Sequence, residues 1–168
     1  MMGDVSIREA TRDDAKAIKH VARDSWHAAY DSVLGADRVD EKVESWYDPE
    51  RLVTDDIEQD DRLFFVAIVD ETVVGFVEMV PDESDDKLAH LYRIYVASDY
   101  WGRGIGSSLL DHIETVLEEQ GFDRLQLSVM AENNVGVSFY ESNGFHRTST
   151  THNDQLDFQQ YEYLKHLG

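Results

Sequence analysis

The chain has 168 residues, 42% hydrophobic and 11% aromatic, so we expect one globular domain spanning residues 1–168. Its net charge of −20 argues against non-specific binding to nucleic acid or to an anionic membrane. No apolar run is long enough to span a bilayer, and the polar N-terminus lacks a secretory signal, which favours a cytoplasmic protein. The lack of cysteine excludes a disulfide framework, a thiolate zinc site and a cysteine nucleophile.

The acidic residues are spread along the whole chain, and they number 35 against 15 basic residues. One interpretation is recruitment of cationic substrates such as polyamines. The other is a protein from a halophilic-type, salt-adapted proteome, in which acidic surfaces maintain solubility. The even spread favours the second interpretation, because a recruiting surface would gather its charge near one site.

The first elements are helical after one weak strand at Val5–Arg8. Thr11 and Asp14 have the spacing of a capping box, and they open a helix that carries apolar residues at helical intervals. These are Ala15, Ile18, Ala22 and Trp26. A second helical stretch is expected around Val39–Arg51.

A β-hairpin follows, since the apolar runs Phe64–Val69 and Val73–Val80 are separated by a turn at 70–72. After an acidic loop, Leu88–Val96 is a third long strand. The pattern up to this point is typical of an antiparallel meander.

The second half alternates strands and helices. A helix follows the glycine-rich turn and ends at Gly121, and its apolar stripe comprises Ile105, Leu109, Leu110, Ile113, Val116 and Leu117. A strand at Arg124–Val129 leads to a helix capped by Asn133 or Asn134, ending at 143–144. Two closing strands are Phe145–Thr151 and Gln160–Leu164. The prediction is a single α/β domain around a mixed sheet, a meander followed by strand–helix–strand–helix–strand.

The turn between the third long strand and the next helix reads Trp-Gly-Arg-Gly-Ile-Gly over residues 101–106. Glycines let backbone N–H groups approach a phosphate at a helix N-terminus. The spacing differs from the dinucleotide fingerprint, and no Lys-Ser/Thr follows as in a P-loop. The alternative is a tight turn that binds no ligand.

A second motif begins about 30 residues later, where Asn133, Gly136, Phe139-Tyr140 and Gly144-Phe145 are spaced as Asn-x-x-Gly-x-x-Phe-Tyr-x-x-x-Gly-Phe. Together with the glycine turn, this motif resembles the GNAT superfamily of acetyl-CoA-dependent N-acetyltransferases. The segment from Trp26 to Tyr30 is similar to the first-helix segment of many such enzymes.

The resemblance implies that acetyl-CoA is the cosubstrate and that no metal takes part. The amides around the glycine turn would bind the pyrophosphate, and the strand edge would bind the pantetheine arm, with the Val96 N–H near the thioester oxygen. The implied coenzyme-binding residues are Ile94, Tyr95, Val96, Trp101, Gly102, Arg103, Gly104, Ile105, Gly106, Ser107, Asn133 and Tyr140. Trp101 departs from the usual Arg or Gln of the family, and Arg103 either adds charge at the phosphates or is a solvated surface residue.

The resemblance gives Tyr140 the role of general acid for the departing thiolate, against the alternative of a packed core aromatic. Asn133 either contacts the coenzyme or simply caps its helix.

The general base is open among three candidates: His90, Glu78 and water. By period-2 alternation His90 shares a strand face with Tyr92, Ile94 and Val96, and similar sequences often carry Glu at this position. Glu78 is a candidate buried carboxylate with a raised pKa. The remaining histidines show no metal-ligand spacing.

The resulting hypothesis is an N-acetyltransferase in which a primary amine attacks acetyl-CoA directly in a ternary complex. The acceptor would be a small molecule such as a polyamine, or a peptide amine. The alternative is a noncatalytic acyl-CoA-binding or regulatory module of the same fold. The resemblance also allows a homodimer.

Overall fold

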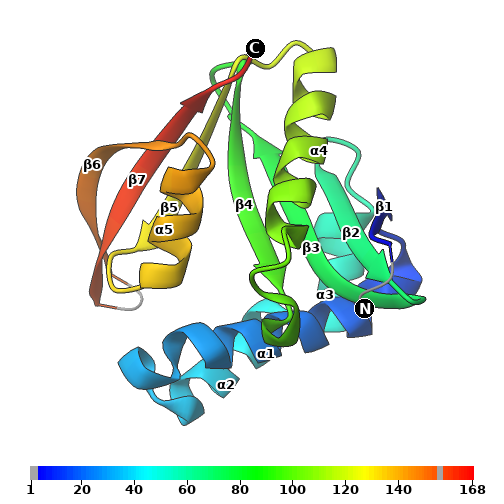
Figure 1. Cartoon of the computed structure of the whole chain (residues 1–168), viewed down its shortest axis with the longest axis vertical. Coiled ribbons are helices and arrows are strands. Elements are labelled where there is room, and N and C mark those ends of the chain that lie inside the picture. The colour runs from blue at the N-terminus through cyan, green and yellow to red at the C-terminus, as the bar shows by residue number, and fades with distance from the viewer. Residues whose placement is uncertain (1–3, 155–156) are drawn as a thin grey trace.

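The computed structural model describes residues 4–154 and 157–168, so the first three residues of the polar N-terminus lie outside the described residues. The described residues form one seven-stranded sheet in the order β1-β2-β3-β4-β5-β7-β6 (Figure 1). The strands are β1 Ser6–Glu9, β2 Leu63–Val69, β3 Thr72–Pro81, β4 Leu88–Val96, β5 Arg124–Met130, β6 His146–Asn153 and β7 Phe158–His166. Neighbouring strands are antiparallel except β4 and β5, which are parallel. The predicted mixed α/β sheet is confirmed.

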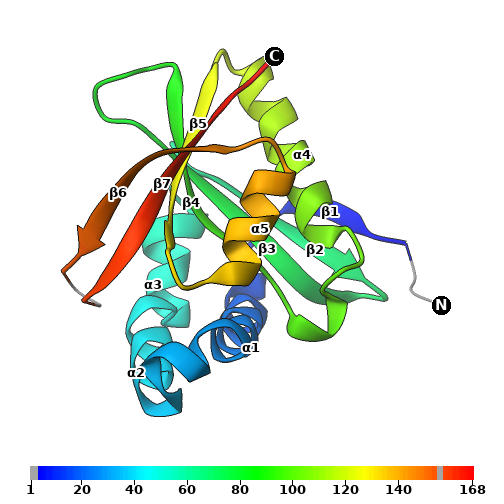
Figure 2. The same cartoon turned by 60° about the vertical axis from the view of Figure 1, so that its left-hand side comes forward.

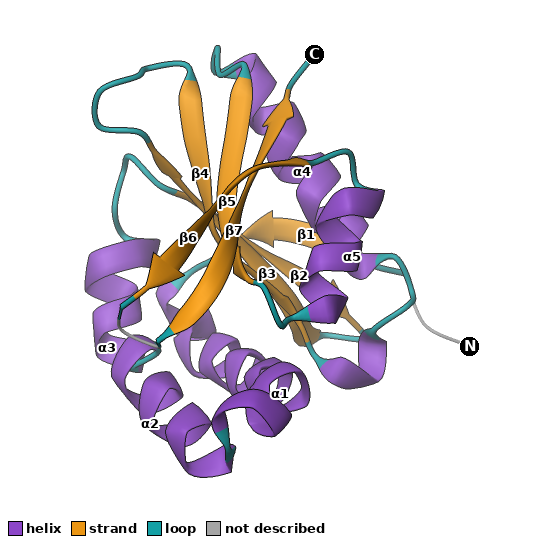
Figure 3. Ribbon diagram, turned by 90° about the vertical axis from the view of Figure 1, so that its left-hand side faces the viewer, coloured by secondary structure: helices purple, strands orange, loops and turns teal. Residues whose placement is uncertain are grey.

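Helices cover both faces of this sheet. They are α1 Ala15–Leu34, α2 Ala36–Trp46, α3 Pro49–Leu52, α4 Ile105–Glu119 and α5 Asn134–Ser142. Helices α1, α2 and α3 lie on one side of the strands and α4 and α5 on the other (Figure 3). Figure 2 shows α5 in front of the strands and the first three helices gathered below them.

Two apolar clusters hold the layers together, one beneath α4 and one beneath α1. Most of the predicted α4 stripe is confirmed, since Leu109, Leu110, Ile113 and Leu117 are fully buried. The unbroken apolar run of β2 alternates between the two clusters: Phe65 packs under α4, and Phe64 packs under α1. A strand buried on both faces needs apolar residues at every position, which explains this run.

The predicted turns are confirmed with small shifts in the helix boundaries. Asp70 and Glu71 both have positive φ, the conformation that closes a two-residue hairpin. The Asp14 carboxylate accepts the Thr11 backbone N–H at 2.8 Å, but it closes a 3₁₀ turn just before α1 begins. The single helical stretch expected around Val39–Arg51 is wrong. Helix α2 ends at Trp46, and Pro49 starts the separate helix α3, because proline suits the first turn of a helix.

Strands β4 and β5 are paired only at their beginnings. The register joins Leu88–His90 to Arg124–Gln126, and beyond it the two strands diverge (Figure 1). The second half of β4 therefore has a strand neighbour on one edge alone, which leaves part of its backbone open toward β5.

A β-bulge at Tyr92 corrects the predicted faces of β4. Glu78 pairs with Arg93 and Met79 pairs with Leu91, so Tyr92 is the extra residue. The bulge shifts the alternation by one: Leu91 packs under α4, and so do Ile94 and Val96. His90 therefore lies on the other face from Ile94 and Val96. The predicted common face is wrong.

Candidate active site

The divergence of β4 and β5 opens into a cavity of about 680 Å³. Its walls come from α1, the end of α2, the second half of β4, the glycine turn, α5 and the facing parts of β5 and β7. Most of the predicted coenzyme-binding residues line this one cavity. They are Ile94, Tyr95, Val96, Trp101, Gly102, Gly104, Ile105, Gly106, Ser107, Asn133 and Tyr140.

The glycine turn presents bare backbone to the cavity. Gly102 and Gly104 have φ of 75° and 80°, and a Cβ added to either would meet no atom within 4 Å. The Ser108 N–H donates to the Gly104 carbonyl at 3.0 Å, so the amides before it are the orphan donors of the α4 N-terminus. Uncovered amides at the positive end of a helix suit an anion such as a pyrophosphate.

Gly106 is required for a different reason, the close approach of α4 to α5. A Cβ added at Gly106 would lie 2.9 Å from the Phe139 ring. Phe139 precedes Tyr140, and their rings meet edge to face at 5.4 Å. The two sequence motifs are therefore in direct contact across the cavity.

Trp101 ties the glycine turn to the end of β4. Its indole N–H donates to the Val96 carbonyl at 2.7 Å. The Ala97 N–H bonds β3 through Val74, so by strand alternation the backbone groups of Val96 point to the open edge. The Val96 carbonyl thus already accepts a hydrogen bond from Trp101, whereas the Val96 N–H faces the cavity.

Tyr140 lies in the cavity wall with its ring packed against Phe145 and Tyr163 at 5.8 and 6.4 Å. Burial raises the pKa of its hydroxyl well above the ordinary value for tyrosine. The phenol is therefore protonated at neutral pH and can donate a hydrogen bond into the cavity.

Asn133 caps α5, because its side-chain oxygen accepts the Gly136 N–H at 2.9 Å. Its amide group also donates to the Tyr30 hydroxyl at 2.9 Å. The sequence left Asn133 and Asn134 as alternatives for the cap, and the structure selects Asn133.

Three predicted site residues are not among the residues that line the cavity. His90 bonds Asp82 at 2.7 Å, and the Arg103 guanidinium lies 5.3 Å from the centre of the Tyr100 ring. Glu78 is fully buried as predicted, but its carboxylate lies behind the cavity wall, 3.6 Å from the Arg93 guanidinium.

Glu78 belongs to a buried charge cluster that the sequence analysis missed. Arg62 bonds both Asp56 and Glu78, at 2.6 and 3.0 Å, and Arg93 lies 3.6 Å from each carboxylate. Burial raises the pKa of Glu78 to about 8; Asp56 adds to the rise, and the two arginines oppose it. Of the four residues only Arg93 lines the cavity. Arg93, a charged residue within the otherwise apolar and aromatic run of β4, was the feature of the sequence that could have indicated this cluster.

The cavity on the α1 side of β4 has an aromatic wall, which the sequence analysis identified only in part. The centre of the Trp26 ring lies 4.6 Å from that of the tilted Tyr30 ring and 5.5 Å from that of the Trp46 ring, which it meets edge to face. The side chain of Tyr95 faces this wall, and its ring lies 6.2 Å from Trp26. Aromatic side chains thus form the α1 side of the cavity, whereas backbone groups form the part near α4.

Comparison with known proteins agrees with this geometry. The model of the acetyltransferase (GNAT) family matches residues 22–145. A spermidine N(1)-acetyltransferase of Thermoplasma acidophilum is 29% identical over 161 residues, which cover 94% of this chain and 98% of the relative.

Solved structures share the fold over nearly the whole chain. The PaiA N-acetyltransferase of Thermoplasma acidophilum, crystallised in complex with coenzyme A, has a TM-score of 0.83 at 28% identity, covering 97% of this chain and 99% of that one. A GNAT-family acetyltransferase of Streptococcus pneumoniae has a TM-score of 0.73 at 21% identity, covering 98% and 100%. The matched residues include both motifs that line the cavity, and the chain belongs to the acetyltransferase (GNAT) family.

Proposed function

We propose that this protein transfers the acetyl group of acetyl-CoA to the primary amine of a small molecule, by direct attack in a ternary complex. One observation carries this proposal: the open edge of β4, the amides of the glycine turn and Tyr140 meet in one cavity. The relative named as a spermidine acetyltransferase and the neighbour crystallised with coenzyme A support both substrates.

The coenzyme fits the part of the cavity next to α4. The amides of Ile105, Gly106 and Ser107 would hold the pyrophosphate, and the bare backbone at Gly104 permits its close approach. The open backbone groups of Ile94 and the N–H of Val96 would bind the pantetheine arm as a further strand would. The Arg103 guanidinium lies over the Tyr100 ring and does not line the cavity, so it would act only as a nearby surface charge for the phosphates.

Acetyl-CoA supplies the acetyl group as a thioester. The amine nitrogen forms a bond to the carbonyl carbon, the carbon–sulfur bond breaks, and the sulfur leaves with a proton. The Val96 N–H stabilises the negative charge that develops on the carbonyl oxygen. Tyr140 donates its phenolic proton toward the sulfur and regains a proton from solvent.

Water is the proton acceptor for the attacking amine in this proposal. The His90 ring is bonded to Asp82 outside the cavity lining, and Arg93 separates the Glu78 carboxylate from the cavity. Neither group reaches the amine directly, whereas a cavity of about 680 Å³ has room for solvent.

We also infer a cytoplasmic enzyme that works in concentrated salt. The net charge of −20 supports this inference, and within the described residues no helix is long and apolar enough to cross a bilayer. The backbone amides of the glycine turn bind an anion at short range, where salt screens weakly.

The test is an acetyl-transfer assay on the purified protein with acetyl-CoA and a panel of amines, including spermidine, simple alkylamines and a peptide with a free N-terminus. Released coenzyme A thiol and the mass of the product report transfer. We expect acetylation of at least one small amine. Coenzyme binding without transfer to any amine would instead support the noncatalytic binding module.

A further inference from the structure

The cavity lining is nearly free of charge. Among the described residues that line it, Arg93 is the one ionic side chain, and no carboxylate is present. An acceptor with a second ammonium group would meet only a cation on the β4 side. The aromatic wall can contact an ammonium group, but an opposite charge for it must come from a carboxylate just outside the lining.

In the described residues, carboxylates contact side chains of the lining beside Arg93 and on β7. Asp56 and Glu78 contact Arg93, but both side chains are already paired with Arg62 and Arg93. The second place is Glu162 on β7, which bonds the side chains of Ser128 and Gln160. Both of these partners line the cavity.

Glu162 is a partly buried carboxylate held in a fixed position. One oxygen accepts the Ser128 hydroxyl, and the other accepts Thr151 Oγ1 and Gln160 Nε2, each at 3.0 Å. Within residues 4–154 and 157–168, no lysine, arginine or histidine makes an ion pair with it. Three neutral donors thus orient the carboxylate and leave its charge uncompensated, as a site for a cation requires.

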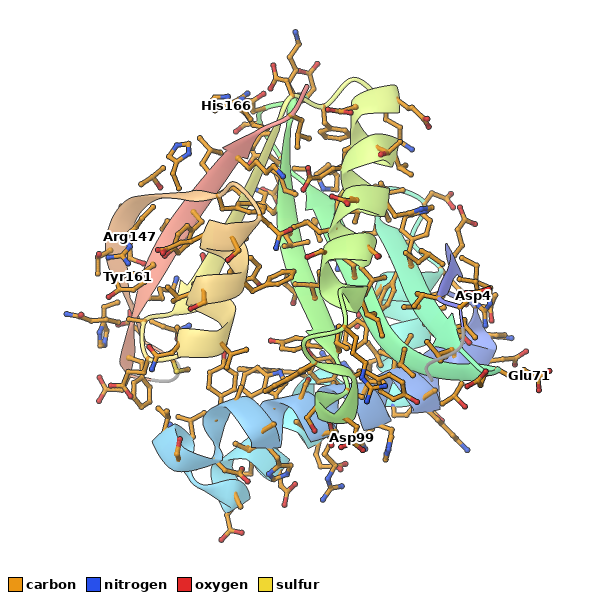
Figure 4. The ribbon with its side chains drawn as sticks, in the orientation of Figure 1. Asp4, Glu71, Asp99, Arg147, Tyr161 and His166 are labelled. Carbon is orange, nitrogen blue, oxygen red and sulfur yellow. The ribbon has the colours of Figure 1, made fainter. Side chains whose placement is uncertain are left out.

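Strand alternation places Glu162 on the α1 side of the sheet, opposite the α4 side proposed for the coenzyme; we call this α1 side the acceptor side. Tyr161 and Tyr163 pack on the α4 side, and Tyr161 lies beside Arg147 (Figure 4). Glu162 lies between them in the sequence, so it points to the opposite face. It pairs there with Ser128, two residues from Met130, which packs in the cluster of Trp26 and Tyr30.

We propose that Glu162 is a specificity-determining residue that binds a second ammonium group of the acceptor. Given the acetyl transfer proposed above, the enzyme then prefers diamines and polyamines to monoamines of the same length. The reacting amine lies near Val96 and Tyr140, and the distal ammonium lies toward β7. Arg93 on the opposite wall disfavours the reverse orientation.

Putrescine and butylamine form a matched pair of acceptors, because they share a four-carbon chain and differ in the second amine. We expect the wild-type kcat/KM to be about tenfold higher for putrescine. In Glu162→Gln this ratio falls to about one through a higher KM for putrescine, while the KM values for butylamine and acetyl-CoA stay within about twofold. Raising the salt concentration lowers the wild-type preference and leaves the variant unchanged.

The control is Glu119→Gln, the same change of charge at an exposed residue ending α4, and it should keep the wild-type ratio. A thermal melt of each variant checks that it folds. An unchanged ratio in Glu162→Gln, or an equal loss in Glu119→Gln, contradicts the role of Glu162. Equal wild-type use of the two amines overturns this inference and keeps the proposed function, whereas transfer to neither, nor to any amine, overturns both.

Discussion

The side chain of Asn133 bonds Gly136 with its oxygen and the Tyr30 hydroxyl with its nitrogen, both at 2.9 Å. One residue therefore caps α5, which carries Tyr140, and ties it to α1, which carries the aromatic wall. Burial raises the pKa of Tyr30 to about 12, so its hydroxyl accepts this bond as a neutral phenol. This contact links the two walls of the cavity.

Replacing Asn133 and Tyr30 in turn distinguishes the helix cap of α5 from the hydrogen bond that joins α5 to α1. Tyr30→Phe removes only the hydrogen bond between α5 and α1 and should cost about 1 kcal/mol of unfolding free energy. Asn133→Ala also removes the cap and should cost about 1 kcal/mol more. Urea unfolding measures both, and the KM for acetyl-CoA should rise further in Asn133→Ala. Equal losses in the two variants would show that the cap contributes nothing.

Tyr140→Phe keeps the packed ring and removes the proton donor. We expect kcat to fall at least about tenfold while the dissociation constant of acetyl-CoA changes less than about twofold. Because burial raises the pKa of this phenol, the wild-type kcat should show no descending limb up to about pH 9. Steady-state kinetics and calorimetry give these quantities. Unchanged kcat would leave Tyr140 as a packing residue.

His90→Gln should retain kcat/KM within about twofold, because its imidazole bonds Asp82 outside the cavity lining. The pH profile of kcat/KM should rise with deprotonation of the acceptor amine in both proteins, since solvent takes the proton. A loss of about a hundredfold, with the ascending limb shifted, would instead make His90 the base.

Glu78 should make stability fall with pH across a defined window. Its pKa is raised from 4.5 to about 8 in the folded protein, so between these values the folded state binds a proton that the unfolded state lacks. Unfolding free energy is therefore lost as pH rises through this window. Glu78→Gln does not titrate, and its stability relative to wild type should increase between about pH 5 and pH 8.5. Urea midpoints that run parallel with pH in the two proteins would rule out the raised pKa.

Gly104→Ala tests the bare backbone of the glycine turn. The residue has φ of 80°, so alanine should cost about 1 kcal/mol of unfolding free energy and also place a methyl group where the pyrophosphate is proposed to bind. We expect at least about tenfold weaker binding of acetyl-CoA by calorimetry. Gly121→Ala is the control, because Gly121 also has positive φ with open space around it, but lies just after the C-terminal end of α4. The control should lose stability and keep coenzyme affinity; weaker binding in both variants would point to general strain.

Much of the fold was predictable because its signals are local. Apolar periodicity located β2, β3 and α4, and Gly121, with φ of 94°, ends α4 as expected. The closing strands β6 and β7 were found but are longer than predicted, because β6 is exposed along most of its length and carries little apolar pattern.

The acceptor side of the site depends on contacts distant in sequence, which a periodic pattern does not reveal. The bulge at Tyr92 places His90 on the face opposite Ile94. The residue types in β4 give no indication of a bulge. Glu162 accepts a hydrogen bond from Ser128, which lies on another strand and 34 residues away in the sequence. The residues proposed to bind the coenzyme could be located in the sequence because they present backbone amides next to glycines, and the structure places most of them in the cavity lining.

The most direct test of the central claim is the release of coenzyme A thiol from acetyl-CoA by the wild-type protein, measured with and without a small amine, in low and molar salt. The account predicts release that depends on the amine, continues in molar salt, and yields the N-acetylated amine in equal amount. Release no faster than hydrolysis with every amine tested, while acetyl-CoA binds, would contradict it.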